Sequence, residues 1–209
     1  MKLSASFLSY LFILAAFLTF VPGYPILLGA FFTTLGIFYS YQTMRENRDI
    51  DYSLLLPIAK SDIVKGKFMF TVLIELCSFA VMLIITIIRM TLLENAGVYT
   101  SNALMCANLT FLGFSLFIFG LFNAVFVGGF FKTAYYFAKP FVTYIIAAML
   151  VIVLAETLHH IPGLETLNTF GFGKLSPQLY VLIIGIIAFA GLSFGALKTS
   201  IRRFEMIDL

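Results

Sequence analysis

The sequence predicts an all-α integral membrane protein with six transmembrane helices and both termini in the cytoplasm. Composition indicates the membrane class, because 61% of the 209 residues are hydrophobic, 11% are charged and the mean hydropathy is +1.04. Soluble domains average about 45–50% apolar and about 25% charged residues. Six apolar segments indicate the helix number, and an uneven distribution of basic residues indicates the orientation. We expect a single transmembrane domain over residues 1–209.

Each apolar segment approaches the roughly 20 residues that a helix needs to cross a bilayer. The first is short and follows a lysine, as a secretory signal would. No small-residue cleavage site follows it, so we expect it to remain as a helix. The fourth is longer than a straight crossing requires, so it could tilt, extend past the bilayer or bend, and its glycines offer places for a bend or for close helix contact. The six segments are 6–21, 24–41, 68–88, 103–131, 140–158 and 179–197.

Basic residues are concentrated on one side of this predicted topology, as they are in the cytoplasmic segments of membrane proteins. The segment 44–67 and the tail 198–209 are therefore expected in the cytoplasm, and the segment 159–178 outside, as a short surface or re-entrant helix. The net charge of +3 gives no reason to expect nucleic-acid binding. The two outer basic residues are Arg89 and Lys174, and the eleven inner ones are Lys2, Arg45, Arg48, Lys60, Lys65, Lys67, Lys132, Lys139, Lys198, Arg202 and Arg203.

The polar segment 44–67 is expected to form a helix, a break and a second helix that leads into the third span. Pro57 lacks an N–H and pushes the preceding residue out of the α region, so it ends the first helix. Ser61 is a suitable N-cap for the second. A simple solvated loop is the alternative. The residues expected to contact a soluble partner are Arg45, Glu46, Arg48, Asp49, Asp51, Tyr52, Leu54, Leu55, Leu56 and Pro57.

Two polar residues fall deep inside predicted spans. Glu75 lies in the third span, where a charge near mid-bilayer costs about 2.5–3.5 kcal/mol on insertion scales. It either lines a substrate path or pairs across a dimer interface, or it is a protonated or hydrogen-bonded structural residue. Asn123 in the fourth span is expected to form a hydrogen bond between helices. Gly191 and Gly195, four residues apart, allow close helix contact, either within the bundle or at a dimer face.

Motifs for chemistry are missing from the sequence. There is no Walker A pattern, so we expect ATP to bind elsewhere, and there is no G-x-S-x-G or H-E-x-x-H. Glu156 and His160 would share one face of a helix, but two ligands do not make a metal site. Cys77 and Cys106 lack metal-site spacing and are expected to be buried. We therefore expect no catalytic residue, metal or cofactor on this chain.

The segment after the second span resembles that of type-2 ABC exporter permeases, the ABC-2 family. The resemblance rests on residues 45–46 (Arg-Glu), 55–58 (Leu-Leu-Pro-Ile) and 62–67 (Asp-Ile-Val-Lys-Gly-Lys), and within the family it points to small six-helix bacterial permeases of peptide or antibiotic export and self-immunity. It implies an exporter-type bundle with a coupling helix that docks on a separate ATP-binding subunit, which would hold ATP and Mg. Family members usually begin with an amphipathic helix, whereas only residues 1–5 precede the first span here.

The resemblance implies the permease subunit of an ATP-driven exporter in the cell membrane, with a second copy or a related permease beside it. An apolar bundle with few fixed polar groups suits an amphipathic peptide, antibiotic or lipid-like substrate. Three alternatives stay open at this point. They are a six-helix substrate-capture subunit of a vitamin uptake transporter, an intramembrane enzyme that uses Glu75 or Glu156 with His160, and a scaffold that binds a partner through segment 44–67 without transport.

Overall fold

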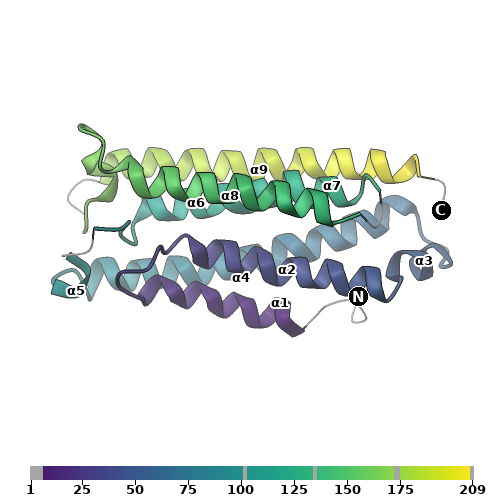
Figure 1. The fold of residues 1–209 in the computed structure, drawn as a ribbon, viewed down its shortest axis with the longest axis horizontal. Coiled ribbons are helices and arrows are strands. Elements are labelled where there is room, and N and C mark those ends of the chain that lie inside the picture. The colour runs from purple at the N-terminus through teal and green to yellow at the C-terminus, as the bar shows by residue number, and fades with distance from the viewer. Residues whose placement is uncertain (1–6, 101–102, 134–135, 172–174, 208–209) are drawn as a thin grey trace.

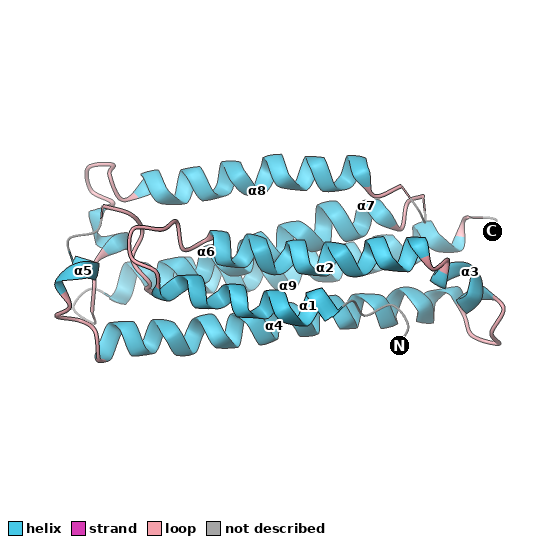
Figure 2. Cartoon of the chain, turned by 60° about the horizontal axis from the view of Figure 1, so that its bottom comes forward, coloured by secondary structure: helices cyan, strands magenta, loops and turns pink. Residues whose placement is uncertain are grey.

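The computed structural model describes residues 7–100, 103–133, 136–171 and 175–207. Within these ranges the regular elements are helical and none is a strand, which confirms the predicted all-α class. The long helices run along one axis and form a single elongated bundle (Figures 1 and 2). One end of the bundle holds α3 (Asp49–Leu54) and the opposite end holds α5 (Gly97–Thr100), and we name them the α3 end and the α5 end (Figure 1).

The first apolar segment forms one rod made of two kinds of helix. α1 (Phe7–Leu11) continues directly into η1, a 3₁₀ helix over Phe12–Phe20. With 5 α residues and 9 3₁₀ residues, the rod is about 25 Å long at about 1.5 and 2.0 Å per residue. Gly23, at φ 71°, then turns the chain into α2 (Leu28–Glu46). A left-handed φ of this kind favours glycine, which has no Cβ.

α2 lies inside the bundle and carries buried hydroxyl groups along its length. Two of its threonines, Thr33 and Thr34, are fully buried. Inside an apolar bundle such hydroxyls need partners, and they find them on neighbouring helices. The hydrogen bonds join Thr33 to Ser78 at 2.7 Å, Thr34 to Tyr144 at 2.7 Å and Tyr41 to Thr71 at 3.1 Å.

α4 (Lys60–Thr91) is 32 residues long and begins well before the predicted third span. At about 1.5 Å per residue it extends about 48 Å, which exceeds the roughly 30 Å hydrocarbon core. The prediction of an N-cap at Ser61 was wrong, because the helix begins at Lys60 with Ala59 as its N-cap and without a side-chain hydrogen bond. The second short helix predicted in segment 44–67 is therefore the first part of α4.

The predicted fourth span contains a change of helix type. α6 (Leu109–Phe122) continues as a π-helix, η2 (Asn123–Val127), and ends in α7 (Gly128–Phe130). The rod starts later than predicted because Asn108 caps it, its side chain accepting a hydrogen bond from the Phe111 N–H at 3.0 Å. Two of its glycines, Gly113 and Gly120, serve close helix contact, because a Cβ on either would lie 3.0 Å or less from the backbone of α9 (Leu175–Glu205).

The last part of the chain holds two long helices and one short turn between them. α8 (Ala138–Leu158) is followed by η3 (Glu165–Asn168), a single 3₁₀ turn where a short helix was predicted in segment 159–178. α9 (Leu175–Glu205) extends beyond the predicted span at both ends. Most of the predicted polar tail 198–209 is therefore helical, and its last two residues lie outside the described part.

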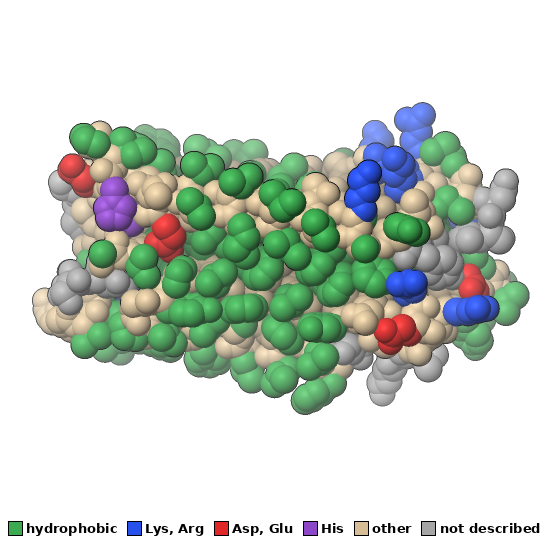
Figure 3. Space-filling model, viewed as in Figure 1, with side chains coloured by type: hydrophobic (Ala, Val, Ile, Leu, Met, Phe, Trp, Pro, Cys, Tyr) green, Lys and Arg blue, Asp and Glu red, His purple; other side chains and the backbone are tan. Residues whose placement is uncertain are grey.

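Four helices in the described residues are long and apolar enough to cross a membrane, namely α4, the rod Leu109–Phe130, α8 and α9. The apolar rod Phe7–Phe20 is shorter, and α2 is not among the four. The surface has a wide hydrophobic middle, with charged side chains gathered at its ends (Figure 3). The chain is an integral, multi-pass membrane protein. Six spans and cytoplasmic termini stay predictions, and Lys2 and Lys174, which entered the charge count, lie outside the described residues.

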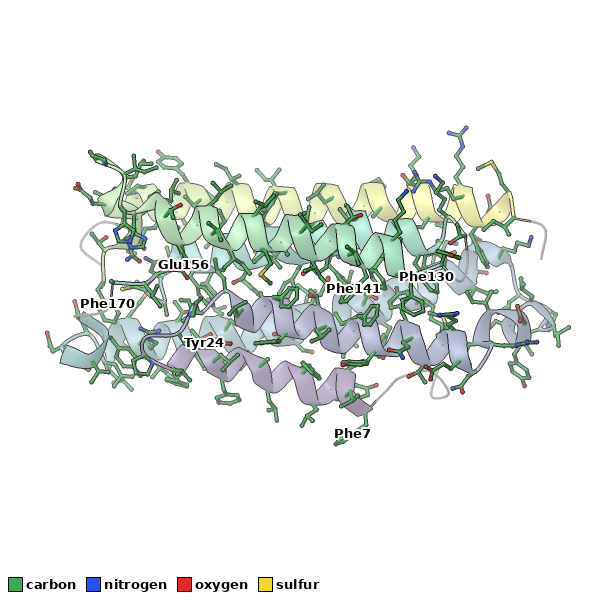
Figure 4. All side chains as sticks on the ribbon, in the orientation of Figure 1. Phe7, Tyr24, Phe130, Phe141, Glu156 and Phe170 are labelled. Atoms are coloured by element: carbon green, nitrogen blue, oxygen red, sulfur yellow. The ribbon has the colours of Figure 1, made fainter. Side chains whose placement is uncertain are left out.

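Aromatic side chains fill the core of the bundle. Phe38 stacks on Phe141 with ring centroids 3.7 Å apart, and Tyr41 meets Phe126 and Phe130 edge to face at 5.3 and 4.9 Å. Phe130 and Phe141 lie between the helices (Figure 4). This cluster joins α2, α7, α8 and η2, so these helices pack as one unit.

Candidate functional site

Segment 44–67 forms a short projection at the α3 end. α2 ends at Glu46, and Arg48 takes a left-handed conformation with φ 52° that turns the chain into α3. A residue other than glycine is uncommon in that region, so the reversal is a specific local feature. α3 ends at Leu54 and a turn with Pro57 separates it from α4, so the predicted break near Pro57 is present.

The tip of this projection exposes large apolar side chains. Leu55 is 83% exposed and Tyr52 is 59% exposed, and Leu56 and Ile58 are exposed beside them. Apolar surface gains about 25 cal/mol per Å² when it leaves water, so such a group favours contact with a partner. Pro57 is also exposed. The exposed charged residues of segment 44–67 are Arg45, Glu46, Arg48, Asp62 and Lys65.

Other residues of the same segment hold α3 against the bundle. Ile50 is fully buried, and the Lys67 Nζ lies 3.5 Å from Asp49 Oδ2. Lys60 Nζ donates a hydrogen bond of 2.7 Å to the carbonyl oxygen of Ile207, just after α9. The predicted contact residues therefore have two kinds of position. Tyr52 and Leu55 face outward, whereas the half-buried Asp49 bonds α4.

A polar cluster joins three helices inside the membrane-spanning part. Asn123 Nδ2 donates hydrogen bonds to Glu75 Oε2 at 2.8 Å and to Ser193 Oγ at 3.0 Å. The three residues come from η2, α4 and α9 and are buried. The sequence singled out Glu75 and Asn123 separately, and the fold brings them together. Ser193 was missed, because nothing in the sequence distinguishes one serine in an apolar helix.

The cluster has unused hydrogen-bonding capacity. Glu75 Oε1 and Asn123 Oδ1 are buried and have no hydrogen-bond partner among the described residues. Few buried polar atoms in native proteins lack a hydrogen-bond partner, so each unpaired atom needs a structural or functional explanation. Asn123 also begins the π-helix, a feature that often occurs at functional sites. The arrangement suits groups that exchange partners when the helices move.

A groove between α4 and α9 reaches this cluster from the surface. It has a volume of about 590 Å³ and is apolar apart from Ser193. Ser193 is 8% exposed, so its hydroxyl links the groove to Asn123 behind it. The groove therefore suits a ligand with an apolar body and one polar group. Its other walls include Phe68, Met69, Leu73, Phe194 and Leu197.

The small residues of α9 face in two directions. Gly191 and Gly195 are exposed, and a Cβ on either would have no atom within 4 Å, so they do not pack within this bundle. The close helix contact lies elsewhere, because a Cβ on Gly185 would overlap the backbone of Gly113 in α6. The sequence shows these glycines inside apolar segments, but only the helix pairing reveals which of them meet.

The α5 end is held by polar contacts. Arg89 is buried, its Nη1 donates to the Thr19 carbonyl oxygen at 2.6 Å, and its guanidinium lies 4.1 Å from the Tyr99 ring centroid. Glu156 Oε2 accepts a hydrogen bond from the Met105 N–H at 2.8 Å (Figure 4 labels Glu156).

His160 and Cys77 lie in different surroundings from those that the sequence predicts. α8 ends at Leu158, so His160 lies beyond the helix on which Glu156 was expected to share a face with it. The part of the chain that is described contains no group of three metal-binding side chains. Cys106 is buried as predicted, but Cys77 is exposed, because it lies on the outward face of α4.

These features define a class: an all-helical, multi-pass membrane protein with a charged, apolar-tipped helix at one end. The family model described as ABC-2 family transporter protein matches residues 1–201, so the chain belongs to that family. It is therefore an ABC transporter permease, whose family implies an ABC ATPase partner and the cell membrane as the usual location. No curated protein and no solved structure matches the chain.

Proposed function

We propose that this chain is the membrane subunit of an ABC exporter and that α3, with the turn after it, is the coupling element on which the ATPase acts. The observation that carries this proposal is the exposed apolar tip of Tyr52, Leu55, Leu56 and Ile58. The same segment exposes charges of both signs, which suits docking in a polar groove of a soluble subunit. The positive-inside pattern supports a cytoplasmic position for this end.

The contacts of α3 indicate how a movement of α3, driven by the ATPase, would be transmitted to the bundle. The Asp49–Lys67 pair passes movement to α4, and the bond between Lys60 and the Ile207 carbonyl links the start of α4 to the end of α9. α4 and α9 carry Glu75 and Ser193, which Asn123 bridges. A shift of α4 against α9 would therefore break and remake these hydrogen bonds, as expected for a switch between two packed states.

The substrate class that fits this bundle is amphipathic, as in a peptide, an antibiotic or a lipid-like molecule. The groove between α4 and α9 offers apolar walls with one polar group, Ser193. Movement of α4 would change the width of this groove and the hydrogen bonds behind it together. A second copy or a related permease would complete the transport path, and the exposed face of Gly191 and Gly195 is available for helix contact.

The test compares Leu55→Asp with Leu92→Asp, because Leu92 is a similarly exposed leucine that follows α4 at the α5 end. The full chain is purified with the ATP-binding subunit that co-purifies with it and reconstituted in vesicles. Loss of a central apolar anchor costs about 2 kcal/mol or more, which is about 30-fold in affinity. We expect Leu55→Asp to lose ATPase binding and ATP-driven transport, and Leu92→Asp to keep both.

Three results would contradict the proposal. The first is ATP-dependent transport by Leu55→Asp at the level of the Leu92→Asp control. The second concerns direction: in vesicles whose cytoplasmic face is outward, an exporter accumulates its substrate inside on addition of ATP. Depletion of a preloaded substrate instead would identify an uptake system. A complex that binds the ATPase and moves no substrate would leave a scaffold as the better description.

A further inference from the structure

A basic pocket opens between α7 and the start of α8. It has a volume of about 400 Å³, which falls in the roughly 300–1,000 Å³ range of ligand pockets. Two lysines, Lys132 and Lys139, line it together with the hydroxyl-bearing Thr133, Tyr136 and Thr143. No acidic side chain is among its described lining residues. Cationic and hydroxyl donors without a nearby carboxylate suit an anion.

The charges around the pocket reinforce this preference. Neither Lys132 nor Lys139 has a salt bridge to any described residue. Two further cations contact chain neighbours of the lining residues: the Arg45 guanidinium is 4.9 Å from the Phe137 ring centroid, and Arg203 Nη1 donates to the Gly128 carbonyl oxygen at 3.0 Å. The two lining lysines attract an anion directly, and the positive potential of the two arginines adds to this attraction.

A hydroxyl in the pocket is also positioned to donate. Thr133 Oγ1 accepts a hydrogen bond from the Tyr136 N–H at 3.1 Å, which leaves its own hydrogen available for a ligand. Thr143 donates its hydrogen to the Lys139 carbonyl oxygen at 2.9 Å, so the donors left for a ligand are the two lysines, Thr133 and Tyr136. A phosphate oxygen accepts hydrogen bonds of both kinds, from ammonium and from hydroxyl groups.

An apolar stripe leads away from the pocket along α8. Val142, Ile146, Leu150 and Val153 are each more than half exposed, and their spacing of three or four residues places them on one face of the helix. The stripe begins one turn after Lys139. A basic pocket at the head of an apolar stripe matches a molecule with an anionic head and a long apolar chain, rather than a free anion.

We propose that this pocket binds the phosphate headgroup of an anionic phospholipid whose acyl chain lies along α8. Lysine and arginine side chains gather at this end of the bundle, beside the hydrophobic middle (Figure 3). Basic pockets between membrane helices are known sites for anionic lipid headgroups, and the cytoplasmic leaflet supplies such lipids. The lining residues of this pocket are distinct from those of the groove between α4 and α9 and from the exposed apolar tip of segment 44–67.

The test uses the full-length chain in a mild neutral detergent and follows its thermal unfolding during titration with phosphatidylglycerol. The pocket variant is Lys132→Gln with Lys139→Gln. The matched control is Lys198→Gln with Arg202→Gln, which removes the same charge from exposed positions of α9 at the same end. We expect phosphatidylglycerol to raise the unfolding midpoint of the wild type and the control, and its apparent affinity to fall at least tenfold in the pocket variant.

Further arms separate the sources of the phosphate and guard against a folding defect. The wild-type protein should bind phosphatidylcholine and glycerol 3-phosphate with at most a tenth of its affinity for phosphatidylglycerol. The variant Lys132→Arg with Lys139→Arg should restore phosphatidylglycerol binding, because arginine keeps the charge. Equal stabilisation by phosphatidylcholine or by glycerol 3-phosphate would overturn the proposal, as would an equal loss of affinity in the α9 control or full affinity in the glutamine variant.

Discussion

Replacing Asn123 with leucine should destabilise the bundle, because three helices share its amide. The amide donates to Glu75 Oε2 and Ser193 Oγ at 2.8 and 3.0 Å. Hydrogen bonds between membrane helices are worth about 0.6 kcal/mol on average and up to about 1.7 kcal/mol, and an unpaired buried group costs about 1–3 kcal/mol. We therefore expect the free energy of unfolding to be about 1–3 kcal/mol lower in Asn123→Leu than in the parent protein. At about 2–4 °C per kcal/mol, the midpoint should fall by about 2–12 °C.

The cysteines provide the assay for this change. The chain has no tryptophan, so its unfolding is better followed with a thiol-reactive fluorophore. In a Cys77→Ser background the buried Cys106 is the remaining thiol, and it reacts when the bundle opens. Thr110→Val is the matched control, because Thr110 is buried and its hydroxyl has no hydrogen-bond partner among the described residues. The control should leave the midpoint close to that of the parent.

A double-mutant cycle then isolates the interaction itself. Glu75→Leu is combined with Asn123→Leu, so that the Glu75 carboxyl is not left buried without its Asn123 partner in the double variant. Removing both polar groups should cost less than the sum of the single changes, with a coupling of about 1 kcal/mol or more. A coupling within about 0.3–0.5 kcal/mol, the range of independent sites, would refute the cluster as a stabilising unit. So would an Asn123→Leu shift no larger than that of Thr110→Val.

Two further predictions follow from helix packing and from the α3 projection. Gly185→Leu should abolish the folded monomer in size-exclusion chromatography, because the leucine side chain would overlap Gly113. Gly191→Leu should elute like the wild type, because position 191 has open space around it. A folded Gly185→Leu chain would disprove the close contact. Glu46→Lys should weaken co-purification of the ATPase and leave the unfolding midpoint unchanged, because Glu46 is exposed. Asp49→Lys should weaken co-purification and also lower the unfolding midpoint, because Asp49 pairs with Lys67. Equal midpoints for these two variants would contradict the anchoring role of Asp49.

Much of the candidate coupling element was predictable, because local chemistry determines it. Pro57 cannot continue a helix, so a break near it follows from covalent structure. Charges crowded between two apolar segments must lie outside the hydrocarbon core, so their position at one end of the bundle follows as well. Which of them face outward was not predictable. Asp49 contacts Lys67 because α3 folds back on α4, and the left-handed turn at Arg48 that directs this has no sequence signal.

The helix ends were the least predictable part of the fold. α4 and α9 extend well past their apolar segments, because a helix already formed in the membrane can continue into polar residues with good helix propensity, such as Lys, Arg and Glu. Hydropathy reports the solvent around a residue, and it does not report where the backbone hydrogen bonds stop. For the same reason the fourth segment began at Leu109, where Asn108 caps the helix, and not at the apolar residues before it.

The sequence by itself determined the membrane class, the polar projection and the absence of a Walker A motif, because hydropathy, charge and short motifs are properties of single residues and of their neighbours along the chain. Only the tertiary structure decided that Asn123 bridges Glu75 and Ser193, and that Gly185 meets Gly113. These contacts join residues far apart in sequence. They depend on how each helix is rotated about its axis and on which helices pair. Helices that are apolar on most of their surface do not specify either in their own sequence, so both are decided only when the helices pack.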